Sequence, residues 1–160
     1  MTIFDDLQAQ MNKERGNAAQ YDAFAAALSA ANWPGFSAWM QHAADDERTH
    51  YGKFRDCLID RNQTPVLTGL AAPQILDGND PILFFEAALA LEKANTQSIL
   101  ALDDASEEDN EGQTEVALIW AIEEQTRSER ELIDALLELK RVDATGLLFL
   151  DREYGEKING

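Results

Sequence analysis

The sequence predicts an all-α protein: an antiparallel four-helix bundle with one long crossover between helices 2 and 3 and a short C-terminal fifth helix. Four long segments repeat apolar residues at steps of three and four, the period of one helix face, and none alternates like a strand. All four prolines lie outside the interiors of these segments. We expect one domain over residues 1–160, with the bundle at about 3–141 and the short helix at about 145–155.

The first two predicted helices span about residues 3–31 and 34–62. Each carries a continuous apolar stripe, formed by Ile3, Leu7, Met11, Ala18, Tyr21, Ala25 and Leu28 in the first helix and by Phe36, Met40, Ala43, Phe54 and Cys57 in the second. Pro34 suits the first turn of a helix. Only a few residues around Asn32 and Trp33 separate the two helices, so we expect antiparallel neighbours.

The third and fourth predicted helices span about residues 81–107 and 113–141. Their stripes contain Phe85, Leu89, Thr96 and Ile99 in the third helix and Leu118, Ile122, Ser128, Leu132, Ala135 and Leu139 in the fourth. Asp80 can cap the helix that Pro81 begins. The short turn at 110–112 again predicts an antiparallel pair.

The connector at residues 63–80 determines the topology. A helix of about 28 residues is about 42 Å long. Eighteen extended residues at about 3.3 Å each can cross that distance, so helices 2 and 3 are predicted to run parallel. After Gly146, the apolar segment 147–154 is the candidate fifth helix.

Composition narrows the classes of partner. Thirty acidic residues against thirteen basic ones give a net charge of −17, which argues against nucleic acid and anionic membranes and favours cations. The single cysteine, Cys57, allows no intramolecular disulfide. Asp5 and Asp6 stand where a secretory signal would be apolar, and no uncharged stretch reaches membrane-spanning length. We therefore expect a soluble cytoplasmic protein.

Five polar residues interrupt the apolar stripes: Glu14, Glu47, His50, Glu92 and Gln125. No Lys or Arg lies on the stripes, and an unpaired buried carboxylate costs several kcal/mol, so such groups shift their pKa, pair, or bind a metal. Glu14 and Glu47 are 33 residues apart across one turn, and Glu92 and Gln125 are 33 apart across another. All five should therefore lie at one level of the bundle.

This level predicts a metal site. Glu47-x-x-His50 places a carboxylate and an imidazole one helical turn apart. A carboxylate-rich set with one imidazole suits iron, manganese or zinc. Three carboxylates could bridge two divalent ions, as in di-iron bundles, although only one Glu-x-x-His is present and the fourth helix offers Gln125 and Ser128.

With these motifs, the chain resembles the non-haem ferritins of bacterial type over nearly its whole length. The matching motifs are Met11–Glu14 with Tyr21, Asp45–His50, Leu91–Lys93, Trp120–Gln125 and Gly146–Glu153. The resemblance implies a cage, expected to hold 24 identical subunits. It also implies a ferroxidase centre that oxidises Fe(II) with dioxygen or hydrogen peroxide and stores Fe(III) as mineral.

The resemblance also assigns roles to residues. Glu14, Glu47 and His50 match the ligands of a first iron, Glu47 would bridge to a second iron, and Glu92 matches the remaining carboxylate of that second site. Gln125 matches a glutamine that orients the centre by hydrogen bonding. The residues that match the tyrosine and the tryptophan beside the centre are Tyr21 and Trp120.

Departures from the family pattern refine the expectation. Ser128 stands where many bacterial ferritins carry a glutamate, which weakens the second iron site. Arg127 replaces an acidic residue of a third iron site, for which Asp46 and Glu124 remain as weaker candidate ligands. Without a second Glu-x-x-His, and with Arg48 in place of a haem-ligating methionine, no haem is expected.

The acidic run near the third turn is expected to be a solvated loop or the entrance of an iron channel, with Glu115 as the candidate channel ligand.

Two alternatives remain open from the sequence. One is a di-iron oxidase or peroxidase of the rubrerythrin kind, which the missing second Glu-x-x-His and the lack of a cysteine cluster disfavour. The other is a storage shell in which Ser128 leaves the second site too weak for fast oxidation.

Overall fold

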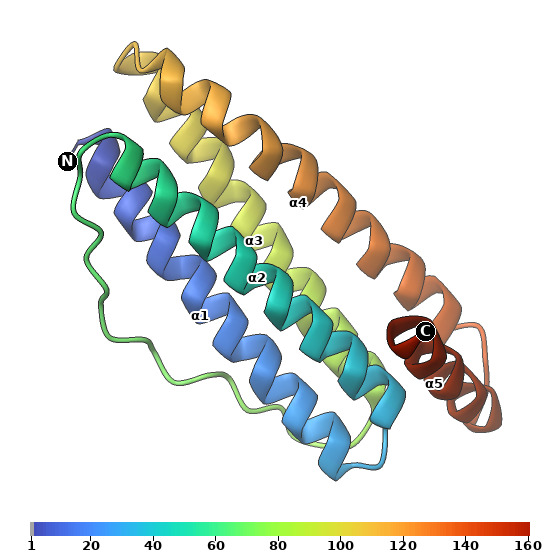
Figure 1. The fold of residues 1–160 in the computed structure, drawn as a ribbon. Coiled ribbons are helices and arrows are strands. Elements are labelled where there is room, and N and C mark those ends of the chain that lie inside the picture. The colour runs from blue at the N-terminus through green and yellow to red at the C-terminus, as the bar shows by residue number, and fades with distance from the viewer. Residues whose placement is uncertain (1) are drawn as a thin grey trace.

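The computed structural model describes residues 2–160 and contains five helices and no strands in that range. The helices are α1 (Ile3–Ala30), α2 (Pro34–Asp60), α3 (Pro81–Glu108), α4 (Gly112–Leu139) and α5 (Ala144–Asn159). Helices α1 to α4 form a bundle, and α5 lies across one of its ends (Figure 1). No helix among these residues is long and apolar enough to cross a membrane.

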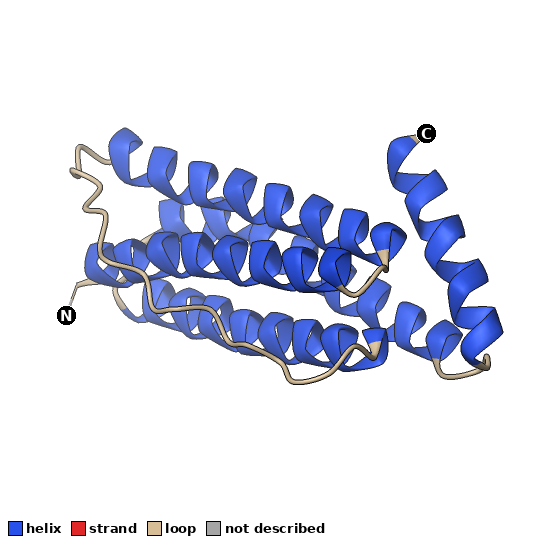
Figure 2. Cartoon of the chain, turned by 90° about the horizontal axis from the view of Figure 1, so that it is seen from below, coloured by secondary structure: helices blue, strands red, loops and turns tan. Residues whose placement is uncertain are grey.

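The predicted topology is confirmed. Helices α1 and α2 form one antiparallel hairpin, and α3 and α4 form another (Figure 1). The connector after α2 runs back along the length of the bundle beside α1 before α3 begins, so α2 and α3 run parallel (Figure 2). The long crossover therefore lies where the reach of the chain predicted it.

Asparagine ends three of the long helices. Asn32, Asn62 and Asn110 follow α1, α2 and α3 with φ angles of 63°, 56° and 55°. Among non-glycine residues, asparagine adopts this left-handed conformation most readily. After α1, the N–H of Trp33 then donates to the carbonyl of Leu28 at 2.9 Å, and the same closing bond follows α2 and α3. These ends fix the lengths of the two hairpins.

Side-chain amides of α1 hold the crossover in place. Gln8 donates to the Thr64 carbonyl at 3.2 Å and accepts from the N–H of Val66 at 2.7 Å. Asn12 pairs with the crossover backbone in the same two-sided manner, and so does Gln20. An otherwise unpaired extended backbone thereby gains hydrogen bonds along its length.

Helix α5 is longer than the predicted range of about 145–155 and reaches Asn159. The prediction followed the apolar run, whereas the last polar turn continues the helix on the protein surface. Gly35 lets α5 approach closely, since a Cβ there would lie 1.6 Å from the Asp151 carbonyl oxygen. The Asp151 carboxylate accepts from the N–H of Phe36 at 2.8 Å and so caps α2, which lacks a cap of its own.

The core consists of two apolar clusters with a polar level between them. One surrounds Phe36 and Phe85 towards α5, and the other surrounds Met11 and Phe54 towards the start of α1. Along each of α1 to α4, the residues of the two clusters are separated by buried polar residues, namely Glu14, Glu47, His50, Glu92 and Gln125. The single polar level inferred from the 33-residue spacing is therefore present.

Candidate metal centre

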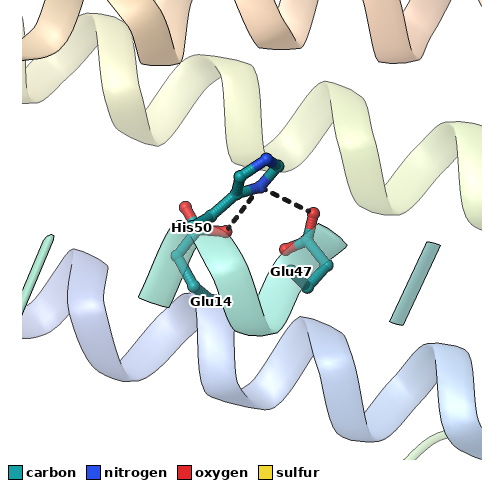
Figure 3. Close-up of side chains that lie close together, drawn as sticks. All are labelled: Glu14, Glu47 and His50. Carbon is teal, nitrogen blue, oxygen red and sulfur yellow. Dashed lines mark ion pairs between the residues drawn. The ribbon is translucent and has the colours of Figure 1, made fainter. Parts of the chain in front are cut away.

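Glu14 on α1 and the pair Glu47 and His50 on α2 converge inside the first hairpin (Figure 3). Their ligand atoms all lie within 4.8 Å of one another. His50 Nδ1 lies 3.4 Å from Glu47 Oε1 and 3.9 Å from Glu14 Oε2. All three side chains are buried, so two carboxylates and one imidazole nitrogen share a small volume away from solvent.

The helix geometry of α2 and packing from α4 orient the imidazole. Positions 47 and 50 are one turn apart, so both side chains leave the same face of α2. Trp120 packs against the His50 ring, with the ring centroids 5.5 Å apart. His50 Nε2 lies 3.7 Å from Glu124 Oε1. Nδ1 therefore faces the two glutamates, while Nε2 faces a third carboxylate.

Glu92 enters the site from α3 on the opposite hairpin. Its Oε1 accepts from the Tyr21 hydroxyl at 2.5 Å, and its Oε2 accepts from Gln125 Nε2 at 2.9 Å. Gln125 also donates to the Glu92 backbone carbonyl at 3.2 Å. These donors come from α1 and α4, so three helices fix the orientation of one carboxylate.

Burial raises the pKa of the three buried glutamates, Glu14, Glu47 and Glu92. The pKa of Glu47 rises from 4.5 to about 8 because burial disfavours its charge and the charge of Glu92 repels it. Burial and the charge of Glu47 hold the pKa of Glu14 well above its usual range. Burial also raises the pKa of Glu92. The pKa of Tyr21 is raised well above 10.0 by burial and by the charge of Glu92.

The residues present fit a divalent metal. Within residues 2–160, Glu47 Oε2 is buried and has no hydrogen-bond partner. No Lys or Arg of that range forms an ion pair with Glu14, Glu47 or Glu92. Buried carboxylates without a cation are costly, and oxygen donors with one imidazole suit iron, manganese or zinc. The positive charge that this level lacks is the charge that a metal ion would supply.

A cavity of about 100 Å³ adjoins the site, and Tyr21, Glu47, His50 and Glu92 line it. It reaches the surface between α2 and α4, where exposed residues, namely His42, Arg127 and Glu131, also line it. Such a volume holds several water-sized groups. The cavity thus connects the surface with the buried carboxylates.

The weaker predicted candidates lie at different distances from this site. Ser128 and Asp46 line the cavity. Glu124 lies beside His50 but also pairs with Arg127, so a cation already shares its carboxylate. Glu115 lies in the first turn of α4, ten residues before Gln125 and thus about 15 Å away along the helix.

Sequence reasoning missed three buried polar residues at this level: Gln10, Asn17 and Asn95. Each lies three or four residues from Glu14 or Glu92 and therefore on the same face of its helix. Helical periodicity could thus have found them. They were overlooked because an uncharged amide carries a much smaller burial cost than a carboxylate.

Fold and site together define a class: a four-helix bundle with a buried cluster of carboxylates and one histidine that could hold a metal ion. A family model described as the ferritin-like domain matches residues 4–142. The bacterial non-heme ferritin of Staphylococcus saprophyticus is 30% identical over 157 residues, covering 97% of this chain and 93% of that protein. Its counterpart in Staphylococcus epidermidis is 28% identical and covers 94% and 92%.

Solved ferritin structures are similar to this chain in fold. An engineered closed form of the Archaeoglobus fulgidus ferritin superposes with a TM-score of 0.92 at 28% identity, covering 96% of this chain and 94% of that one. The open-pore ferritin of the same archaeon gives a TM-score of 0.91 at 26% identity, with the same coverage. The chain belongs to the ferritin family.

Proposed function

We propose that this chain is the subunit of an iron-storage ferritin with ferroxidase activity. It would oxidise Fe(II) with dioxygen or hydrogen peroxide at a di-iron centre and store Fe(III) mineral inside a cage of 24 copies. The observation that carries this proposal is the convergence of Glu14, Glu47 and His50 within 4.8 Å. Bacterial non-heme ferritins are the relatives in sequence, and a cytoplasmic location is the expectation that follows from them.

The geometry supports a ligand role for each of these residues. Glu14 and His50 Nδ1 would bind the first Fe(II), because both face the same point inside the first hairpin. Glu47 would bridge to the second Fe(II), since one of its oxygens faces His50 and the other has no partner among residues 2–160. Glu92, held by Tyr21 and Gln125, would complete the second position.

The electrons of the proposed reaction balance with Fe(II) and the oxidant alone, so no further cofactor is needed. Two Fe(II) ions each give one electron to dioxygen, which takes up two protons and leaves as hydrogen peroxide. With peroxide as the oxidant, two electrons and two protons yield water. The substrates would enter through the cavity between α2 and α4.

Ser128 supports a second candidate function, a storage shell with slow oxidation. It lines the cavity beside Glu47 and Glu92 and offers only a hydroxyl there. Besides the shared Glu47, the second position would have only one carboxylate, Glu92. The second Fe(II) would therefore bind more weakly than the first. The rate of oxidation by the unmodified protein distinguishes the two functions.

Stopped-flow measurement of Fe(II) oxidation tests the proposal. We expect Glu47→Ala and His50→Ala to remove the fast phase while leaving folding and assembly intact. Glu123→Ala is the matched control, because Glu123 is an exposed glutamate on α4 and its loss should leave the rate unchanged. Initial rates equal to that of the unmodified protein in both site variants would refute the assignment.

A further inference from the structure

Two buried amides at the metal level have no role in the proposed ligand set. Gln10 on α1 is 2% exposed and Asn95 on α3 is completely buried. Gln10 Nε2 lies 2.5 Å from Glu14 Oε1 and 2.8 Å from Asn95 Oδ1. The remaining atom of the amide, Gln10 Oε1, accepts from the Ser98 hydroxyl at 2.7 Å. These contacts use both donor hydrogens of Gln10 and fix its orientation.

Asn95 continues the same chain of hydrogen bonds. Its Nδ2 lies 3.3 Å and 3.4 Å from the two carboxylate oxygens of Glu14 and 3.4 Å from Gln125 Oε1. Gln125 in turn donates to Glu92 Oε2 at 2.9 Å. Each group in this chain therefore donates to the next, starting from Ser98. The chain ends at two carboxylates, Glu14 on α1 and Glu92 on α3.

Glu47 provides the contrast. Its Oε2 has no hydrogen-bond partner within residues 2–160, whereas Glu14 accepts from two amides and Glu92 from one amide and one phenol. Amide and phenol donors thus orient Glu14 and Glu92, whereas one oxygen of Glu47 accepts no such hydrogen bond within residues 2–160.

A merely structural role does not explain these amides. The level is flanked by apolar clusters on both sides, and apolar side chains of the same size would fill the space without the cost of burying amides. Metal sites commonly depend on such outer hydrogen bonds, whose loss costs about 10- to 100-fold in metal affinity or activity.

We propose that Gln10 and Asn95 are positioning residues that hold Glu14 in its metal-binding orientation and connect it, through Gln125, to Glu92 at the second metal position. The inference rests on the proposed function for its iron chemistry, but its metal-binding consequence can be measured separately.

The test uses Co²⁺ and the assembled, metal-free protein. The visible absorption of bound Co²⁺ reports the number and geometry of its ligands. We expect Asn95→Leu and Gln10→Met, which keep side-chain size and remove the donors, each to weaken Co²⁺ binding about 10- to 100-fold and to change the absorption bands. The double variant should lose little more than the stronger single variant, because the two amides act as one unit.

Ser106→Ala is the matched control. Ser106 is buried on the same helix as Asn95, and its hydroxyl donates only to the Asp103 carbonyl, at 2.8 Å. Its removal should leave Co²⁺ affinity and spectrum unchanged.

Unchanged Co²⁺ affinity and spectrum in both Asn95→Leu and Gln10→Met would overturn the inference. If Asn95→Leu does not assemble by size-exclusion chromatography, Gln10→Met alone decides. The two proposals fail separately. If the unmodified protein oxidises Fe(II) slowly but the variants bind Co²⁺ more weakly, only the ferroxidase assignment is refuted. If the unmodified protein oxidises Fe(II) fast but the variants bind Co²⁺ normally, only the positioning role is refuted.

Discussion

The Tyr21 hydroxyl on α1 lies 2.5 Å from Glu92 Oε1 on α3, and both side chains are buried. This bond joins the two hairpins at the level of the proposed metal site. It also holds the carboxylate that we assign to the second metal position, so it would contribute both to stability and to the orientation of the proposed ligand.

We predict that Tyr21→Phe lowers the free energy of unfolding of the metal-free protein by about 1–3 kcal/mol, because a buried acceptor loses its donor. Fe(II) oxidation should slow about 10-fold as Glu92 loses its orientation. Urea denaturation and stopped-flow absorbance measure the two effects. The control is Tyr154→Phe, since Tyr154 donates to Glu138 at 2.9 Å outside the site. Equal oxidation rates in the two variants would contradict the assigned role.

The metal-free protein should lose stability as pH rises from about 4.5 to about 8. Below 4.5, Glu47 is protonated in both the folded and the unfolded chain. Between 4.5 and about 8 only the folded chain keeps the proton, so unfolding releases it and is favoured by rising pH, by up to about 1.4 kcal/mol per pH unit. Thermal denaturation across this range measures the slope.

Glu47→Gln isolates this effect from the repulsion among the many surface carboxylates. The variant cannot titrate at position 47, so its melting temperature should fall less steeply between pH 5 and 8. A slope equal to that of the unmodified protein would show that Glu47 does not carry the raised pKa.

Glu14→Gln and Glu92→Gln should leave the metal-free protein no less stable, because each removes a buried carboxyl group whose pKa burial raises. Both should lose much of the stabilisation by divalent metal, which is about 2.7 kcal/mol for an ion at 100 times its Kd. Thermal melts with and without Zn²⁺ measure both effects. Glu86→Gln, an exposed site on α3, should keep the full metal response; a clear drop in melting temperature of metal-free Glu14→Gln would count against this account.

Gly35→Ala should destabilise the protein and release α5, because the added Cβ would lie 1.6 Å from the Asp151 carbonyl oxygen. Gly52→Ala, in the middle of the same helix, meets no atom within 4 Å and should be neutral or stabilising by up to about 1 kcal/mol. Melting temperature and proteolysis of the C-terminal segment measure the difference. Equal behaviour of the two variants would mean that α5 does not depend on this close approach.

The fold could be predicted from the sequence because its signals are local. Periodic apolar residues define each helix. Asn32 and Asn110 mark the ends of α1 and α3, because asparagine favours the left-handed backbone conformation that ends a helix. The level of the site followed from the equal spacing of Glu14 to Glu47 and of Glu92 to Gln125.

Other features depend on contacts between distant residues. The cap that Asp151 places on α2 spans 115 positions, and the bond from Gln10 to Asn95 spans 85. Helical periodicity can place Gln10 and Asn95 on the buried faces of their helices. It does not reveal which distant residue each of them contacts, so their partners become visible only in the folded chain. The last turn of α5 is polar and mostly exposed, so it has no apolar period from which its helical structure could be predicted.

The most direct test of the central claim is a crystal structure after soaking in Fe(II), with anomalous scattering recorded at the iron edge. The account predicts two iron peaks per subunit, the first bound by Glu14, Glu47 and His50 and the second by Glu47 and Glu92. Iron confined to the protein surface, with no peak among these four side chains, would contradict it.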